Sequence, residues 1–224
     1  MPIRKYPLVN DQIYHVYNRS VAQQPIFRNK REYNIFLNLI VYYKFVSPPM
    51  RFSFLSRLDK EEKAMLIENL YKSNNNLVNI YAFCLMPNHY HLLLRQKQEK
   101  GIMNFIRLIQ NSYAHYLNIK IKRFGSVFQS PFKAKRVEND EQFLHIARYI
   151  HLNPLTTYLV GSPKDLESYE WCSFKDYSEE KSRKWVDTSF LMAFHKDKEK
   201  LKKFTIDQVD YQRKLEKIKH LLID

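Results

Sequence analysis

Two histidines separated by a single residue carry the clearest chemical signal in this chain. His89 and His91 lie in the stretch YAFCLMPNHYHLLLR, at residues 81–95. Side chains alternate between the two faces of a β-strand, so a strand over 89–95 would place both imidazoles on one face and Tyr90 with the leucines on the other. Two imidazoles so placed can bind one metal ion, and the opposite face has the apolar content that a core requires.

The histidine pair does not by itself identify a metal. The chain has eight His residues, and two at this spacing arise by chance fairly often in such a chain. Two imidazoles without thiolates or clustered carboxylates fall short of a structural zinc set. A hard divalent ion such as Mg²⁺ prefers oxygen ligands, but His and an amide oxygen are tolerated where substrate phosphates complete its shell.

A second group of reactive side chains lies in DEQFLHIARYIHLNP, at residues 140–154. His145, Tyr149 and Asn153 are spaced i, i+4 and i+8, which makes one stripe on a helix. Tyr149 offers a phenolic nucleophile, and the amide oxygen of Asn153 could join the two histidines as a third ligand. Because Pro154 disfavours α geometry in the residue before it, we expect Asn153 to lie just past the helix end. Spacing alone favours a simpler interpretation, a packed tyrosine and a capping asparagine.

Composition indicates a polyanionic partner. The 224-residue chain has 37 Lys and Arg against 23 acidic residues, a formal net charge of +14. An excess of this size attracts nucleic acid, and the 16 Tyr and 15 Phe interleaved with the cations suit a surface that stacks on bases. The amino terminus lacks the apolar stretch of a signal peptide, and no segment approaches the roughly 20 apolar residues of a membrane span. Two distant cysteines form no disulfide framework. We expect a cytoplasmic, nucleoid-associated protein.

The elements around these residues predict an α+β fold with the ferredoxin-like order β-α-β-β-α-β, an extra C-terminal catalytic helix and helical additions. The expected elements are strand 13–19, helix 29–45, hairpin 78–85 and 89–94, helix 102–123, strand 132–137 and helix 140–152. A charged insertion with a short helix interrupts this order at about 46–76. In such a sheet both main helices cover one face, so the second face stays open and the histidine pair would lie on it. The basic strand with Lys133, Lys135 and Arg136 would converge there.

Taken together, the motifs resemble those of the single-tyrosine HUH transposases, specifically the transposase-like proteins associated with repetitive extragenic palindromes. The resemblance runs through YHVYNR at 14–19, PIF at 25–27, YAFCLMPNHYHLLLR at 81–95, SYAHYLN at 112–118, GSVFQSPFKAKRV at 125–137, ARYIHLNPL at 147–155 and WCSF at 171–174. It covers roughly residues 10–178. This ordered set is far more specific than the histidine pair alone.

The resemblance implies a defined chemistry. His89 and His91 would be the HUH pair, with Asn153 as the third ligand of a Mg²⁺ or Mn²⁺ ion. Tyr149 would attack a phosphodiester in single-stranded or hairpin DNA, giving a 5′-phosphotyrosine and a free 3′-OH. Rejoining would then need no nucleotide cofactor. A tyrosine has an unperturbed pKa of about 10, so it needs help to lose its proton. His145, one turn earlier, could accept that proton; this role is inferred from the spacing.

The resemblance also suggests DNA contacts, domain limits and assembly. The residues expected to contact DNA are Arg19, Arg95, Arg123, Gln129, Lys133, Lys135 and Arg136. Two positions depart from the family pattern: Ser20 stands where a Gly is common, and Ser130-Pro131 replaces the usual Gly-Arg, which removes a cation from the DNA loop. We expect a transposase domain over 1–178, a basic helical tail over 179–224, and a homodimer.

Two other classes of function stay open. A domesticated DNA-binding regulator would keep the fold without cleavage, but the intact set of His89, His91, Tyr149 and Asn153 argues against it. An RNA-binding ferredoxin-like module would show exposed sheet aromatics in place of the histidine pair and no metal dependence. A zinc hydrolase is less favoured, because no positioned Glu accompanies the histidines.

Overall fold

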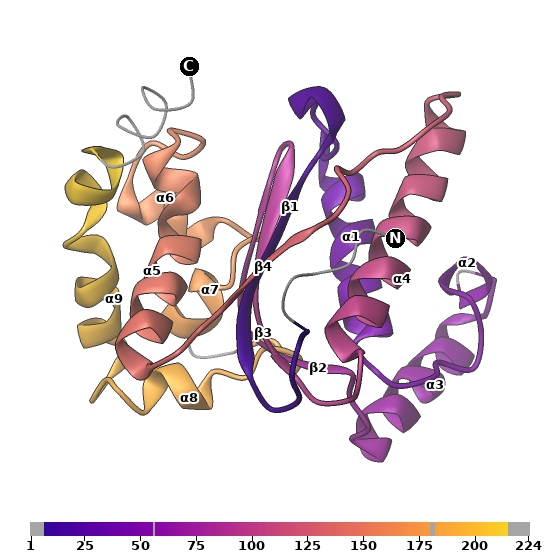
Figure 1. The fold of residues 1–224 in the computed structure, drawn as a ribbon, viewed down its shortest axis with the longest axis horizontal. Helices are drawn as coiled ribbons and strands as arrows, with labels where there is room; N and C mark the ends of the chain where they lie inside the picture. Colours follow the sequence, from indigo (N-terminus) through magenta and orange to yellow (C-terminus); the bar gives the residue numbers. More distant parts are fainter. Residues whose placement is uncertain (1–6, 56, 180–181, 215–224) are drawn as a thin grey trace.

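A four-stranded antiparallel sheet forms the centre of the described chain, with helices on both of its faces (Figure 1). The computed structural model describes residues 7–55, 57–179 and 182–214. The strand order is β2-β3-β1-β4, and the strands are β1 (Ile13–Arg19), β2 (Val78–Met86), β3 (His89–Gln96) and β4 (Lys133–Arg136). With the insertion set aside, the chain order of strands and helices is the ferredoxin-like one, as predicted.

Two helices cover the first face of the sheet, α1 (Lys30–Tyr43) and α4 (Gly101–Lys120). Asn29 caps the N-terminus of α1, and its side chain accepts a hydrogen bond from the Glu32 backbone N–H at 3.1 Å. Tyr90 of β3 points into this layer: its ring centre lies 5.3 Å from that of Phe36, and its hydroxyl accepts from Gln110 at 2.8 Å. The alternation predicted for β3 is therefore confirmed.

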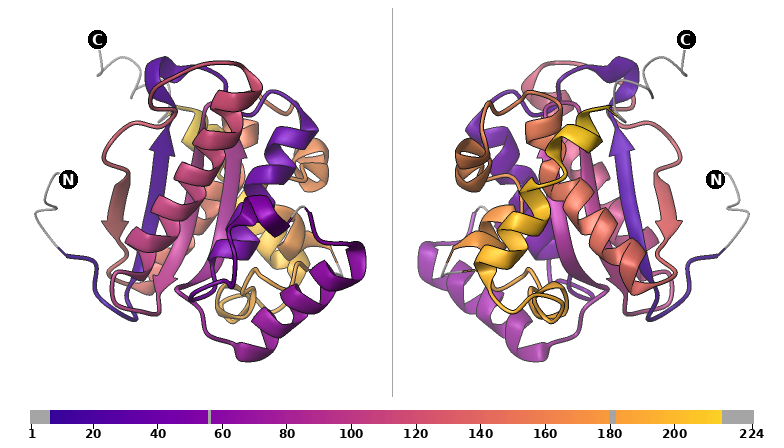
Figure 2. Two further views of the ribbon diagram at one scale, coloured as in Figure 1. Left: turned by 90° about the vertical axis from the view of Figure 1, so that its right-hand side faces the viewer. Right: turned by 90° about the vertical axis from the view of Figure 1, so that its left-hand side faces the viewer.

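The second face is covered, and the expectation that it stays open is wrong. Helix α5 (Asp140–Thr156) lies across β2 and β3 on that side (Figures 1 and 2). Seven consecutive residues of β2 from Ile80 to Met86 are buried, as in a strand enclosed on both faces. Further covering elements follow, namely α6 (Pro163–Ser168), α7 (Phe174–Ser178), α8 (Ser189–Met192) and α9 (Lys198–Ile206). The second face is covered because α5 carries an apolar stripe that packs against it. This stripe includes Phe143, Ala147 and Ile150, all buried.

Helix α5 continues through Pro154 to Thr156, so Asn153 lies inside the helix and not beyond its end. Burial of the last turn offsets the restriction that a proline places on the residue before it, since Leu152 and Leu155 are at most 1% exposed. The Thr156 hydroxyl donates to the Leu152 carbonyl at 3.1 Å, which satisfies a carbonyl near the helix end.

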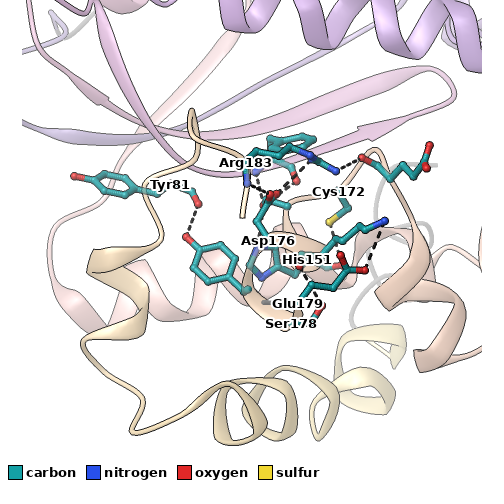
Figure 3. Close-up of polar contacts among 12 residues, drawn as sticks. Tyr81, His151, Cys172, Asp176, Ser178, Glu179 and Arg183 are labelled. Carbon is teal, nitrogen blue, oxygen red and sulfur yellow. Dashed lines mark hydrogen bonds and ion pairs between the residues drawn. The ribbon is translucent and has the colours of Figure 1, made fainter. Parts of the chain in front are cut away.

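A buried polar network ties α5 to the segment after it (Figure 3). His151 is fully buried, which lowers the pKa of its imidazole to about 3, and its Nε2 lies 3.0 Å from Ser173 Oγ. Ser173 Oγ also accepts from the Phe83 backbone N–H of β2 at 2.8 Å. Asp176 pairs with Arg183 at 3.3 Å. The WCSF motif therefore joins α5 to the sheet through its serine.

The insertion and the tail differ in how they pack. Helices α2 (Phe52–Leu55) and α3 (Lys60–Ser73) form the insertion, and the side chains of α3 are half-buried or exposed. The described part of the tail packs on its own domain: the Arg148 guanidinium of α5 lies 4.4 Å from the Phe204 ring centre. The apolar tail positions Leu215, Ile218 and Leu222 lie outside the described residues. Within the described chain, no helix combines the length and apolarity needed to cross a membrane.

Candidate active site

The histidine pair shares its face of the sheet with two aromatic residues of β1. Tyr17 lies directly opposite His91 in the antiparallel register, and Arg19 lies opposite His89. Ring centres are 5.1 Å apart for His89 and His91, and 5.6 Å apart for Tyr17 and His91. His15 stacks on His91 at 5.1 Å. The structure thus confirms that both histidines lie on one face of the sheet, and α5 covers that face.

Tyr149 of α5 lies against these histidines. Its ring centre is 5.5 Å from that of His91 and 6.0 Å from that of His15, both in edge-on geometry. The competing candidates from the sequence are Tyr113 and Tyr116 of the preceding long helix. Tyr113 lies elsewhere, buried between α1 and α4, where its hydroxyl donates to the Ile26 carbonyl. Tyr149, the expected nucleophile, therefore lies beside His91 of the histidine pair.

Hydrogen bonds at Nδ1 orient both histidines. His89 Nδ1 lies 2.6 Å from Asn88 Oδ1, which can only accept, so Nδ1 carries the proton and Nε2 the lone pair. His91 Nδ1 lies 2.9 Å from His15 Nε2. Burial, and after it the charge of Arg19, lowers the pKa of His89 to about 4, so this imidazole is neutral near pH 7. A neutral imidazole held through Nδ1 is typical of a metal ligand.

Asn153, the expected third ligand, carries a buried amide. Asn153 is 4% exposed, and its Nδ2 donates to the Tyr149 backbone carbonyl at 2.9 Å. Its amide oxygen is therefore the atom suited to coordination. Within the described residues no group of three or more His, Cys, Asp or Glu is arranged to hold a metal ion. Two imidazole nitrogens and one amide oxygen fit a divalent cation whose shell is completed by phosphate oxygens.

A family comparison agrees with this geometry. The family model described as "Transposase IS200 like" matches residues 39–153, just over half of the chain. The chain belongs to the IS200-like transposase family. The matched range contains His89, His91, Tyr149 and Asn153.

The transposase fold is also found among solved structures. One described as a REP-associated tyrosine transposase bound to a REP hairpin matches with a TM-score of 0.54 and 14% identity, covering 84% of this chain and 95% of that chain. At this identity the likeness shows a shared fold. A search of curated proteins found no match.

In this member of the IS200-like transposase family, the proposed base His145 lies on the exposed side of α5. Its side chain is 57% exposed, and its Nε2 lies 3.7 Å from Glu141. Its Nδ1 lies 2.6 Å from Arg148. The ring contacts described for Tyr149 are with His15 and His91 instead. The assignment of His145 as base stays a prediction.

The expected DNA-contacting cations divide between the two faces of the sheet. Lys133 and Lys135 of β4 are exposed and lie opposite Tyr17 and His15, so they share the face of the histidine pair. Arg136 lies opposite Tyr14 on the other face, and it donates to Gln12 at 2.8 Å. The sequence predicted that all three would converge, whereas the register brings only the two lysines to the site.

Two of the remaining expected contacts lie at opposite ends of β1, and the third lies past the end of α4. Arg95 pairs with Ile13 at the end far from His89, and its Nε donates to the Asp11 carbonyl at 3.1 Å. Gln129 lies at the near end, where its backbone N–H donates to the Arg19 carbonyl at 2.9 Å. Arg123 lies past the end of α4 and donates to the Ser126 carbonyl at 2.9 Å. Gln129 is therefore closer to the site along the strand than Arg95.

Sequence reasoning missed His15 and Tyr17, whose rings lie beside His91. The available signal was the same alternation that identified the histidine pair: in IYHVYNR, His15, Tyr17 and Arg19 fall on one face of a strand. What the alternation could not supply is the pairing of β1 with β3, which places His15 against His91.

Proposed function

We propose that this protein is a Mg²⁺- or Mn²⁺-dependent endonuclease and strand transferase that acts on single-stranded, hairpin-containing DNA through a 5′-phosphotyrosine at Tyr149. The observation that carries this proposal is the contact of the Tyr149 ring with His91 and His15, with Asn153 one turn further along the same helix. Hairpin DNA is proposed as the substrate because the matched transposase structure holds a hairpin.

The proposed reaction is a transesterification at one phosphorus. The Tyr149 hydroxyl oxygen forms a bond to phosphorus and loses its proton, while the bond from phosphorus to the 3′ oxygen breaks. The departing 3′ oxygen keeps the electron pair and takes up a proton, which leaves a 3′-OH. One phosphodiester replaces another, so the reverse reaction joins a 3′-OH to the held 5′ end without a nucleotide triphosphate.

The chain's own residues have separate roles in this proposal. His89, His91 and Asn153 would hold the cation, and His15 would orient His91 through its hydrogen bond at 2.9 Å. When bound, a divalent cation supplies positive charge to the scissile phosphate and to the leaving oxygen. His145 is retained as the proposed proton acceptor because it lies one turn before Tyr149 on α5.

The polarity of the covalent adduct tests the proposal. A DNA strand that carries a hairpin is labelled at either its 3′ or its 5′ end and incubated with the protein and Mn²⁺. A 5′-phosphotyrosine retains the fragment on the 3′ side of the cut, so the 3′ label should migrate with denatured protein. The 5′ label should appear on a shortened free strand with a 3′-OH. Migration of the 5′ label with the protein would contradict the proposed bond.

Binding should depend on salt and on unpaired nucleotides. Phosphate contacts release counterions, so the logarithm of the association constant should fall linearly with the logarithm of salt, by about 0.7 per phosphate contact on a single strand. Hairpin or single-stranded DNA should bind more tightly than a blunt duplex of equal length, because unpaired bases can stack on aromatic side chains. Fluorescence polarisation measures both. A preference for plain duplex would favour the non-cleaving regulator.

A homodimer is part of the same proposal. The sheet has an edge at β4, a strand of four residues whose outer backbone groups can pair with another chain. Light scattering at micromolar protein should give twice the chain mass of 27.2 kDa. A strictly monomeric protein that still cleaves and rejoins hairpin DNA would refute the dimer and leave the single-site chemistry in place.

A further inference from the structure

One long segment of the chain is basic and free of acidic residues. From Lys100 to Val137 the sequence contains eight Lys and Arg residues and no Asp or Glu. This segment forms α4, the loop after it, and β4, which carries Lys133 and Lys135 beside the histidine site. The backbone of this segment runs from the end of α4 through the loop to β4 (Figure 1), so its cations are distributed along that path.

The end of α4 exposes large apolar side chains within this basic segment. Phe124 is 96% exposed, Ile119 is 66% exposed and Ile121 is 38% exposed. A nearly fully exposed phenylalanine is unusual, because burying such a ring is favourable. A shallow pocket of about 510 Å³ lies beside Phe124 and is also lined by Lys122 and Arg123.

Hydrogen bonds hold the turn that presents Phe124. The Asn118 amide donates to the Gly125 carbonyl at 2.9 Å, and the Arg123 backbone N–H donates to the Asn118 carbonyl at 3.0 Å. The Arg123 side chain donates to the Ser126 carbonyl at 2.9 Å. Gly125 has φ of +92°, a conformation that favours glycine. The exposed ring therefore sits on a defined turn.

The same loop is attached to the strand end that borders the histidine site. The Val21 backbone N–H donates to the Val127 carbonyl at 3.0 Å, and Gln129 donates to Arg19 at 2.9 Å. Arg19 lies opposite His89. A DNA strand at the site would therefore have a continuous protein path from Arg19 along this loop toward Phe124.

We propose that Phe124 stacks on an unpaired base of the bound DNA, with Lys122 and Arg123 contacting the flanking phosphates. The inference rests on the proposed function only in taking DNA as the ligand. An exposed aromatic ring among cations fits a nucleic acid, because every base has a π-face and every linkage is anionic. A second copy of this basic tip would be repelled by the first. Lys120 is not included, because it pairs with the buried Glu32 at 2.8 Å.

The test compares Phe124→Ala with Phe124→Trp in the full-length protein. Affinity is measured by fluorescence polarisation in chelator, which prevents cleavage, for a hairpin with an unpaired tail and for a fully paired duplex of equal length. Phe124→Ala should weaken binding to the tailed hairpin about tenfold or more and leave duplex binding nearly unchanged, while Phe124→Trp should retain wild-type affinity. The expected loss of about tenfold is typical of alanine substitutions at aromatic side chains that stack on bases.

Phe54→Ala is the matched control. Phe54 is 44% exposed and lies 4.7 Å from the Arg57 guanidinium, so it also presents a ring beside a cation, but on the insertion. Its removal should leave both affinities unchanged. Unchanged melting temperatures for all variants would show that the fold is intact.

Three outcomes would overturn the inference. Equal loss on tailed hairpin and duplex would exclude base stacking, and unchanged affinity in Phe124→Ala would exclude any role in binding. A changed oligomeric mass in Phe124→Ala would assign the surface to a second copy. Formation of the covalent adduct is measured in a separate assay. If the wild-type protein forms no adduct but Phe124→Ala still weakens binding to the tailed hairpin, the proposed cleavage is refuted and base stacking is supported.

Discussion

Tyr149→Phe is expected to abolish DNA cleavage and the covalent adduct while DNA affinity and melting temperature stay close to wild type. The substitution removes one hydroxyl and keeps the ring that lies 5.5 Å from His91 and 6.0 Å from His15. Loss of a nucleophile lowers the rate by several orders of magnitude, here at least about 10⁴-fold. A denaturing gel with 3′-labelled hairpin DNA measures the adduct, and polarisation measures affinity.

Tyr113→Phe provides the matched control for this prediction. The Tyr113 hydroxyl donates to the Ile26 carbonyl in the core between α1 and α4, so its removal should lower stability by about 1 kcal/mol. The adduct should persist in this variant and in Tyr116→Phe. If Tyr149→Phe forms adduct and either control does not, the nucleophile lies on α4 and the assignment is wrong.

The sequence predicted the local elements well because their signals are local. Alternation over 13–19 and 89–94 identified β1 and β3, and it put His89 and His91 on one face. Helical spacing identified α1, α4 and α5. Of the two capping candidates before α5, Asn139 and Asp140, it is Asn139 that caps the helix, through a 2.9 Å hydrogen bond from Gln142. The order of these elements along the chain was then sufficient to predict the ferredoxin-like sheet.

The covered second face depends on contacts between distant segments. The C-terminal segment adds Val186 to the edge of β2 at Ile80, and it brings Cys172 opposite Cys84, 88 positions earlier, with both thiols free. No local periodicity in the sequence predicts either contact. The nearly uninterrupted apolar run of β2 was the available indication, since a strand with one solvated face would alternate.

Register decided which residues reach the site. The prediction treated Lys133, Lys135 and Arg136 as one basic group, but adjacent residues of a strand point to opposite faces. Pairing of β4 with β1 puts the lysines beside Tyr17 and His15 and turns Arg136 away. The role of His15 likewise follows only from its position against His91 across the paired strands.

His89→Ala and His91→Ala are each expected to lose divalent-ion binding and cleavage together. Each substitution removes one of three proposed ligands, and the remaining imidazole and amide cannot hold the cation alone. We expect Mn²⁺ affinity, measured by electron paramagnetic resonance on the protein without DNA, to fall more than about 100-fold, which exceeds the range for outer-shell partners. Asn153→Ala should weaken both binding and cleavage. Full activity in excess chelator would contradict the metal assignment.

Substitutions at His15 test whether this residue binds the cation itself or only orients the proposed ligand His91. His15→Gln retains an acceptor near the position of Nε2, whereas His15→Phe keeps a ring of similar size and removes the acceptor that lies 2.9 Å from His91 Nδ1. His15→Phe should lower Mn²⁺ affinity by about 10- to 100-fold, and His15→Gln should restore most of it. Because His15 is buried, equal melting temperatures for the two variants are required for the comparison. Wild-type Mn²⁺ affinity in both His15 variants would show that His91 binds the cation without this hydrogen bond. A loss of Mn²⁺ affinity in both variants as large as that of His91→Ala would indicate that His15 is itself a ligand.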